Sequence, residues 1–469
     1  MIARGDVSSK KLAWLLTAIA AGALCALLPT PQGLSRIAQL VLAITVFTAV
    51  LWAGQALNNG VASVLMMALM VIVGIKPALA LSGFATPPYW ILLSVLFYGF
   101  AMKKTRLADR ISYYILSLFP GTYAGILSAF FVIGLVLALG VPSMTVRTAI
   151  MTPIAWALAQ SLGLPNRSKG SALIILTTVE MAVLPGLAFL YGSLDGPVVA
   201  AAFAAKHLPL SWIGYAQVMT LPTLLLCGLI LITNPWVLRP EKPLSASADF
   251  ARKGLESLGP FTRPELVTAI VVVVSITLWA TDRYHHLPSF LISMLALPVF
   301  AFAGIVKDED IGTGVSWSLL LFLGGIFSLA NVIQEYKVTD WLAGYFVPVA
   351  QNLIFSVPLL LAAVAVAMFV LRFLDPSAFI AIPVLFLPIS DVTSAAGIPP
   401  LVLMAPILLA SAPFWLSFQN FWMAMGEGIT SNQAFTAAQR VRLASSYALI
   451  ALLTATLSVG YWKLIGVLR

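Results

Sequence analysis

The sequence predicts an all-α polytopic membrane protein, with about 11 transmembrane helices plus two re-entrant hairpins arranged in two inverted repeats. Hydrophobic residues make up 61% of the chain and charged residues 9%, whereas about a quarter of the residues in a soluble domain are charged. Apolar stretches of roughly 20 residues, the length that crosses a bilayer, recur along the whole chain. Two apolar blocks are interrupted at matching positions of the two halves.

The first half begins with Lys10 and Lys11 before an apolar run. Because further apolar segments follow at once, we interpret this run as a span and not as a cleaved signal peptide. A dense apolar block, 111–160, is interrupted at Pro142 and Ser143 and predicts the first hairpin. The other spans of this half are expected near 11–29, 37–57, 61–75, 89–102, 171–205 and 214–234.

Residues 235–265 form the one extended polar segment and divide the chain almost in half. We therefore predict a first repeat half over 1–234, a cytoplasmic linker over 235–265 and a second repeat half over 266–469. Each half should contain scaffold helices and one hairpin, and the second hairpin is the block 353–390, broken at Asp375-Pro376-Ser377. The remaining spans are expected near 266–281, 288–306, 315–333, 400–437 and 443–463.

The two halves carry the same ordered series of features. Pro142-Ser143 corresponds to Pro376-Ser377, and Asp195-Gly196 sits where the second half has Gly426-Glu427. Paired interruptions of this kind are typical of transporter folds and indicate the binding site. The alternative is a pair of unrelated proline kinks.

The distribution of basic residues predicts the orientation. If the N-terminus is cytoplasmic, most lysines and arginines fall in cytoplasmic loops, as the positive-inside rule requires. The first hairpin then opens inward and the second outward, which makes the repeats inverted. The net charge of +9 therefore indicates basic loops and not nucleic-acid binding. The absence of a transit-like N-terminus suits a multi-pass protein of a bacterial inner membrane.

Seven charged residues lie inside apolar segments, where an ionisable side chain is a functional suspect. The alternative for each is a structural ion pair or a snorkelling side chain. They are Arg147, Glu180, Asp195, Arg372, Asp375, Asp391 and Glu427.

The interruptions suggest how an anion and a cation could bind. The free amides at Ser143-Met144-Thr145 would begin a helix, whose N-terminus favours an anion, and Arg147 adds a guanidinium that can grip a carboxylate or sulfate with two hydrogen bonds. Freed carbonyls near Gly192 and Gly426, with hydroxyls of Ser143 or Ser377, could bind sodium. Asp195 and Glu427 could instead be cation ligands or proton carriers. Neither the two cysteines nor the three histidines form a catalytic or metal-binding motif, so an enzyme is disfavoured.

Several stretches resemble the divalent anion/sodium symporters of the ion transporter superfamily. They are 99–110 (GFAMKKTRLADR), 141–147 (VPSMTVR), 258–265 (LGPFTRPE) and 462–466 (WKLIG). The resemblance implies transport of a dicarboxylate, citrate or sulfate, sodium as the coupling ion, no other cofactor, and a homodimer in the lipid bilayer. It also implies a scaffold domain and a transport domain that moves like an elevator.

The resemblance assigns roles to residues of the two tips. Ser143 and Thr145 match positions that contact substrate and sodium, and Arg147 matches a plant plastid branch. The expected substrate-binding residues are Pro142, Ser143, Met144, Thr145, Arg147, Ser377, Ala378 and Phe379. The expected cation-coupling residues are Ser143, Gly192, Asp195, Gly426 and Glu427.

The chain also departs from the family pattern. Met144 replaces the asparagine of the first tip, and the second tip reads Ser377-Ala378-Phe379 instead of Ser-Asn-Thr. Coupling to protons and anion exchange without a cation are therefore alternatives. A sodium/proton- or arsenite-type exchanger of the same superfamily is a third.

Overall fold

The computed structural model describes residues 9–244, 249–353, 355–373, 375, 378–416 and 419–468. Within these ranges every secondary-structure element is a helix, which confirms the predicted all-α class. Seven helical stretches in these ranges are long and apolar enough to cross a membrane. They are α2 (Arg36–Gly54), α7 (Tyr123–Gly140), α9 (Lys169–Val183) with η2 (Leu184–Ala188), α11 (Trp212–Leu238), α13 (Arg263–Ala280), α17 (Trp317–Glu335) and α23 (Ala437–Leu464).

Shorter helices complete the fold. Those that are mostly apolar are α1 (Ser9–Leu27), α3 (Asn59–Ile72), α10 (Asp195–Ala205), α15 (Ser289–Phe302), α19 (Val357–Leu371), α20 (Ala381–Ala395) and α21 (Pro400–Leu409). The others are α4 (Pro77–Ala80), η1 (Ser82–Ala85), α5 (Pro87–Lys104), α6 (Leu107–Ser117), α8 (Met144–Ser161), α12 (Asp249–Ser257), α14 (Asp282–His285), α16 (Asp308–Thr313), α18 (Val338–Leu353) and α22 (Phe421–Ile429).

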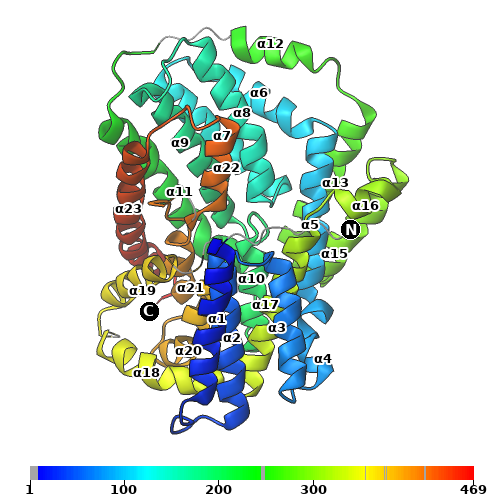
Figure 1. Ribbon diagram of the computed structural model, residues 1–469. Helices are drawn as coiled ribbons and strands as arrows, with labels where there is room; N and C mark the ends of the chain where they lie inside the picture. The colour runs from blue at the N-terminus through cyan, green and yellow to red at the C-terminus, as the bar shows by residue number, and fades with distance from the viewer. Residues whose placement is uncertain are drawn as a thin grey trace.

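The same order of helices occurs twice. In the first half α5 and α6 precede the hairpin α7–α8, the broken pair α9–α10 and the long helix α11. In the second half α17 and α18 precede the hairpin α19–α20, the broken pair α21–α22 and the long helix α23. The two hairpins lie toward opposite ends of the molecule, α7–α8 in the upper part and α19–α20 in the lower part (Figure 1). This is the arrangement expected for inverted repeats.

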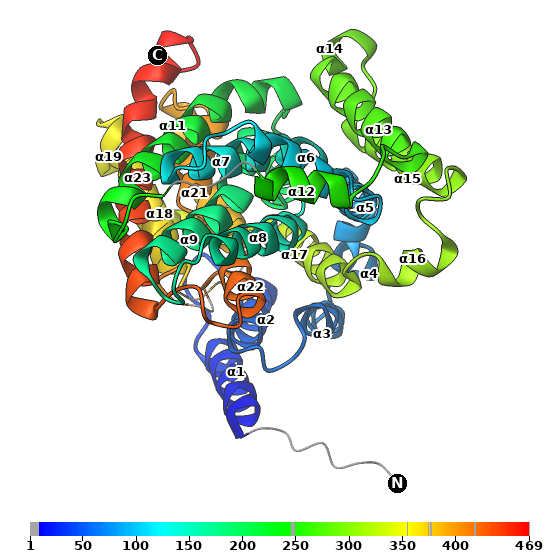
Figure 2. The ribbon, with the colours of Figure 1, turned by 90° about the horizontal axis from the view of Figure 1, so that it is seen from above.

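The helices pack in two groups that meet at α10. Viewed from above, α7 to α9, α11, α21 and α23 form the main cluster (Figure 2). The surrounding helices include α13 to α16, at the right of the picture, and α1 to α3, at its lower edge. Helix α10 packs against α5 and α17 as well as against α20. It therefore joins the hairpin-bearing cluster to the surrounding helices.

Local sequence signals explain where the site helices begin. The hydroxyls of Thr122, Ser168 and Ser211 accept hydrogen bonds from backbone amides in the first turns of α7, α9 and α11. Such N-caps satisfy amides that have no partner inside the helix. Close packing then depends on small residues: a Cβ on Gly134 of α7 would lie 1.8 Å from the carbonyl oxygen of Met181 in α9. Only glycine permits this approach.

Several predicted boundaries shift. The block 111–160 contains the end of α6 as well as the hairpin α7–α8, and the second hairpin extends from α19 to the end of α20 at Ala395. The expected spans 171–205 and 400–437 are broken at 184–194 and 410–420. The second break therefore lies before Gly426 and Glu427, which are inside α22. Pro413, which has no amide hydrogen, lies in the actual break.

Candidate functional site

The first hairpin tip is a three-residue interruption, 141–143, between α7 and α8. Ser143 is the N-cap of α8 and is almost fully buried; its hydroxyl accepts a hydrogen bond from the amide of Val146 at 3.4 Å. Met144 is fully buried, and the indole Nε1 of Trp422 in α22 lies 3.1 Å from its sulfur. The second broken helix pair therefore covers the first tip.

Helix α5 contacts this tip through a residue without a side chain. A Cβ on Gly99 would lie 3.5 Å from Val141 and 3.7 Å from both Ser143 and Val146. Thr145, the next predicted site residue, is half-buried. The tip is thus a packed element at the border between α5 and the hairpin cluster.

Arg147 ties the first tip to the first helix break. Its guanidinium is fully buried and donates from Nη1 to the carbonyls of Val141 and Gly192, both at 2.6 Å. Nε donates to the carbonyl of Ala182 at 2.6 Å and Nη2 to that of Val183 at 3.3 Å. Helix C-termini carry partial negative charge, so this cation stabilises the ends of α7 and α9. The predicted contact of Arg147 with substrate stays a prediction, because in this conformation main-chain carbonyls accept these hydrogen bonds.

Arg372 makes the same kind of connection in the second half. It is fully buried at the end of α19, and Nε donates to the carbonyl of Ser411 at 2.7 Å. Nη2 donates to the carbonyl of Gln419 and Nη1 to that of Asp375. The arginine therefore joins the second tip to both ends of the break 410–420. Arg147 follows its tip in the chain, whereas Arg372 precedes its tip.

At the second tip, a carboxylate of the protein itself caps the following helix. The carboxylate oxygen Oδ2 of Asp375 accepts hydrogen bonds from the amides of Ile380 and Ala381, both at 2.9 Å, immediately before and at the start of α20. Ala378 has a φ of 71° and, like Phe379, is buried. Ser377 and Pro376 lie outside the described residues. The start of α20 thus holds a carboxylate of the chain itself, whereas α8 is capped by a neutral hydroxyl.

Asp195 lies between the two arginine connections. It is the first residue of α10 and is 2% exposed, and Oδ2 lies 3.5 Å from the hydroxyl of Ser193. Its Oδ1 has no hydrogen-bond partner among the residues that the structure describes. Arg372, Asp375 and Arg147 all act on this carboxyl electrostatically. Two arginines and two aspartates therefore form one buried cluster where tips and breaks meet.

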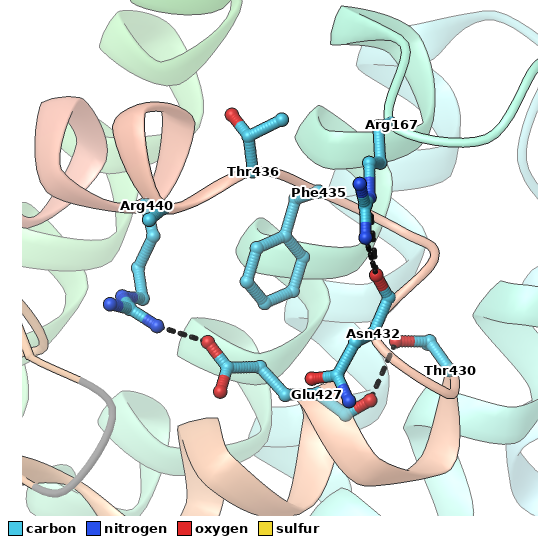
Figure 3. A pocket seen from close by; sticks show the side chains of 8 residues that line it. Arg167, Glu427, Thr430, Asn432, Phe435, Thr436 and Arg440 are labelled. Atoms are coloured by element: carbon cyan, nitrogen blue, oxygen red, sulfur yellow. Dashed lines mark hydrogen bonds and ion pairs between the residues drawn. The ribbon is translucent and has the colours of Figure 1, made fainter.

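Glu427 lies elsewhere. It forms an ion pair with Arg440 of α23 and lines a cavity of about 360 Å³ together with Arg167, beside the loop that follows α22. Figure 3 shows Arg440 pointing at the Glu427 carboxylate and Arg167 pointing at Asn432. The carbonyl of Gly426 accepts from Thr430 and so is not a freed carbonyl. The coupling roles predicted for Gly426 and Glu427 are untested, but these residues do not belong to the central cluster.

Sequence reasoning did not include Asn420 among the site residues. Its side-chain oxygen accepts from the amide of Met423 at the start of α22, and its amide group donates to the carbonyl of Ala412 at 3.4 Å. Asn420 therefore links the beginning of the break 410–420 to the start of α22. The available signal was an N-cap residue directly before an apolar helix.

Comparisons with known proteins agree with this architecture. The family model of the sodium:sulfate symporter transmembrane region matches residues 9–468. Dicarboxylate transporter 1 of Spinacia oleracea chloroplasts is 25% identical over 405 residues, 84% of this chain and 71% of that protein. The putative malate transporter YflS of Bacillus subtilis is 26% identical over 351 residues, 72% of each chain.

Two solved structures share the fold. The YdaH transporter of Alcanivorax borkumensis covers 98% of both chains with a TM-score of 0.58 and 14% identity. MtrF of Neisseria gonorrhoeae, described as an antimetabolite efflux pump, covers 96% of this chain and 94% of that chain with a TM-score of 0.51 and 14% identity.

Proposed function

Because the chain belongs to the sodium:sulfate symporter family, the divalent anion/sodium symporters that its motifs resemble, we propose that it is a secondary active transporter of a di- or tricarboxylate or of sulfate. It is a membrane transporter and not an enzyme. The observation that carries the proposal is the buried cluster of Arg147, Arg372, Asp195 and Asp375 where two hairpin tips meet two helix breaks. Charges buried in this way mark substrate and ion pathways in membrane proteins.

The first tip is the better anion site of the two. Within the described residues the start of α8 is capped by the neutral hydroxyl of Ser143 alone, and Thr145 adds a second hydroxyl two residues later. At the start of α20 the carboxylate of Asp375 already accepts the amide hydrogens. A substrate carboxylate is therefore expected at Ser143 and Thr145, beside Met144. A dicarboxylate is favoured, since the names of several relatives indicate dicarboxylate or malate transport.

Sodium coupling is disfavoured by the arginines. The carbonyl of Gly192, which the sequence suggested as a sodium ligand, accepts a hydrogen bond from Arg147. A fixed guanidinium repels a sodium ion at the same oxygens, and burial strengthens this repulsion. Arg372 likewise occupies the carbonyls of Ser411 and Gln419 and repels a sodium ion there. We therefore favour anion exchange or coupling to protons, with sodium symport as the alternative that the family name suggests.

The two helix groups suit an elevator mechanism. The moving unit would contain the hairpins, the broken pairs, α11 and α23; the scaffold would contain α1 to α3, α5, α13, α15 and α17. Gly99 lies at their border and presents no side chain to the first tip. We further propose a homodimer in a bacterial inner membrane, with substrate and lipid as its other partners and the segment 235–265 in the cytoplasm.

Flux through proteoliposomes tests the proposal. Purified protein should exchange internal unlabelled malate or succinate for external labelled anion, and citrate and sulfate define the substrate range. Folded protein that moves none of these anions, in exchange or in net uptake, would refute it. Alkalinisation driven by a sodium gradient without any anion would instead favour the sodium/proton exchanger.

A further inference from the structure

A buried acid that has no cationic partner among the described residues lies outside the cluster just described. Glu180 of α9 is 4% exposed, and its Oε2 accepts a hydrogen bond from the Asn234 side chain of α11 at 2.6 Å. The same amide nitrogen donates to the hydroxyl of Thr177 at 2.9 Å. Oε1 of Glu180 has no hydrogen-bond partner in the part of the chain that the structure describes.

No positive group pairs with this carboxyl within the described residues. Helix α9 packs against α7, α8, η2, α11, α22 and α23, and neither α7 nor η2 contains a charged residue. The groups of the other helices that face or flank it are neutral or already partnered. They are Cys227 and Tyr447, on which Glu180 acts electrostatically, Arg147, which binds main-chain carbonyls, and the ion pair of Glu427 with Arg440.

An unpaired carboxylate in this place would be very unfavourable, because burial removes its hydration and nothing replaces it. The neutral, protonated acid is therefore the form that this conformation stabilises. Asn234 suits both forms, since an amide offers a donor to the carboxylate and an acceptor to the carboxylic acid. An arginine or lysine at the same place would fix the ionised form.

Glu180 also borders both helix breaks, whose carbonyls accept hydrogen bonds from the buried arginines. A cavity of about 10 Å³, roughly enough for one water, is lined by Glu180 and Val183 on one side and by Ala412 and Asn420 on the other. The carbonyl of Val183 accepts from Arg147. Ala412 and Asn420 directly adjoin Ser411 and Gln419, whose carbonyls accept from Arg372. A change of charge at Glu180 therefore acts on both helix breaks.

We propose that Glu180 is a proton-binding site of the transport cycle: its O–H bond breaks to release a proton to water in one orientation of the hairpin cluster, and the carboxylate takes up a proton from water in the other. The inference rests on the proposed anion transport and adds the coupling ion. One proton moving with a dianion reduces the charge that crosses the bilayer. The Asn234 amide positions the carboxyl in both states.

The test uses full-length protein in proteoliposomes and two variants. Wild-type protein should show net malate uptake that rises at least fivefold with an inward proton gradient, and malate addition should alkalinise the outer medium. Glu180→Gln should lose this stimulation but keep malate exchange within about threefold of wild type at all pH values. Glu180→Asp should restore part of the stimulation. Thr178 is a neighbouring buried residue of α9 whose hydroxyl has no hydrogen-bond partner among the described residues. The control variant Thr178→Val should respond to the gradient like wild type.

The outcomes separate the two proposals. If wild-type protein exchanges malate but neither responds to a proton gradient nor moves protons, the inference is overturned while anion transport stands. Because that measurement uses wild-type protein, it tests the inference even if Glu180→Gln does not fold. Unchanged gradient stimulation in Glu180→Gln would also overturn it. Wild-type protein that moves no anion in any mode would instead refute the proposed function.

Discussion

The Nη1 atom of Arg147 lies 2.6 Å from the carbonyl oxygen of Gly192, which joins the tip of the first hairpin to the break between α9 and α10. The second half repeats this relationship with Arg372 and Gln419. Each half of the molecule thus fastens its hairpin to its broken helix with one guanidinium. In both halves the acceptors are main-chain carbonyls at helix ends or in the breaks, and hydrogen bonds to such groups stabilise a broken helix inside a membrane.

Replacing the first arginine should damage stability as well as transport. In Arg147→Ala, the carbonyls of Val141, Ala182 and Gly192 lose their hydrogen-bond donor. We expect the free energy of unfolding to fall by about 3–5 kcal/mol and malate uptake to be lost. Thermal unfolding of detergent-solubilised protein measures the first effect and proteoliposome uptake the second. Arg167→Ala, an exposed site, serves as the control. Wild-type melting together with wild-type uptake would contradict the connecting role.

Transport should not require sodium. Arg147 and Arg372 occupy the carbonyls at both breaks, so malate uptake in sodium chloride and in choline chloride should agree within about twofold. The measurement is initial uptake against sodium concentration at constant ionic strength. Saturable sodium stimulation with a Hill coefficient above one would show that a sodium site exists despite the arginines.

Removing the charge of Asp375 should weaken the second tip. Asp375→Asn loses a charge-assisted cap on the amides of Ile380 and Ala381, and we expect a destabilisation of about 1–2 kcal/mol. Asp391→Asn is the matched control, because the side chain of Asp391 is 70% exposed although it pairs with Lys206. Equal melting temperatures for the two variants would argue against the capping role.

The pH dependence of stability should report the contact between α5 and α16. Hydrogen bonds from Lys104 and from the amide of Lys307 hold the pKa of Asp310 below its ordinary value. The fold therefore favours the ionised form, and this stabilisation is present at neutral pH and is lost as the pH falls through the lowered pKa. Asp310→Asn should melt earlier than wild type at pH 7, and the difference should shrink only as the pH falls below about 4. A difference that grows on acidification would contradict the assignment.

Cysteine labelling should place the two hairpin bases on opposite sides of the membrane. With Cys25 and Cys227 replaced, Ser161→Cys at the end of α8 should react with an impermeant maleimide only from the cytoplasm. Ala396→Cys after α20 should react only from outside. Both positions are exposed, so the measurement is labelling in intact cells and in inside-out vesicles. Reaction of both from one side would refute the inverted arrangement.

Much of the architecture was accessible from sequence because hydropathy and chain breaks are local properties. Pro142 and Ser143 marked the first tip correctly, and the apolar runs marked most helices. The second break was misplaced because Gly426 and Glu427 resemble Asp195-Gly196 in composition. Tertiary contacts keep Gly426 helical: α22 packs against α9, and a Cβ on Gly426 would lie 2.9 Å from Val179. That glycine reflects helix packing and not unwinding.

By itself, the sequence determined that the chain crosses a membrane many times, that its halves repeat, and that Arg147, Arg372, Asp195 and Asp375 are charges in apolar surroundings. Only the tertiary structure decided what those charges contact. The carbonyls that bind Arg147 lie up to 45 residues away along the chain and those that bind Arg372 up to 47. A buried charge must find its partners among whichever groups packing brings near it, and the order of residues does not reveal them.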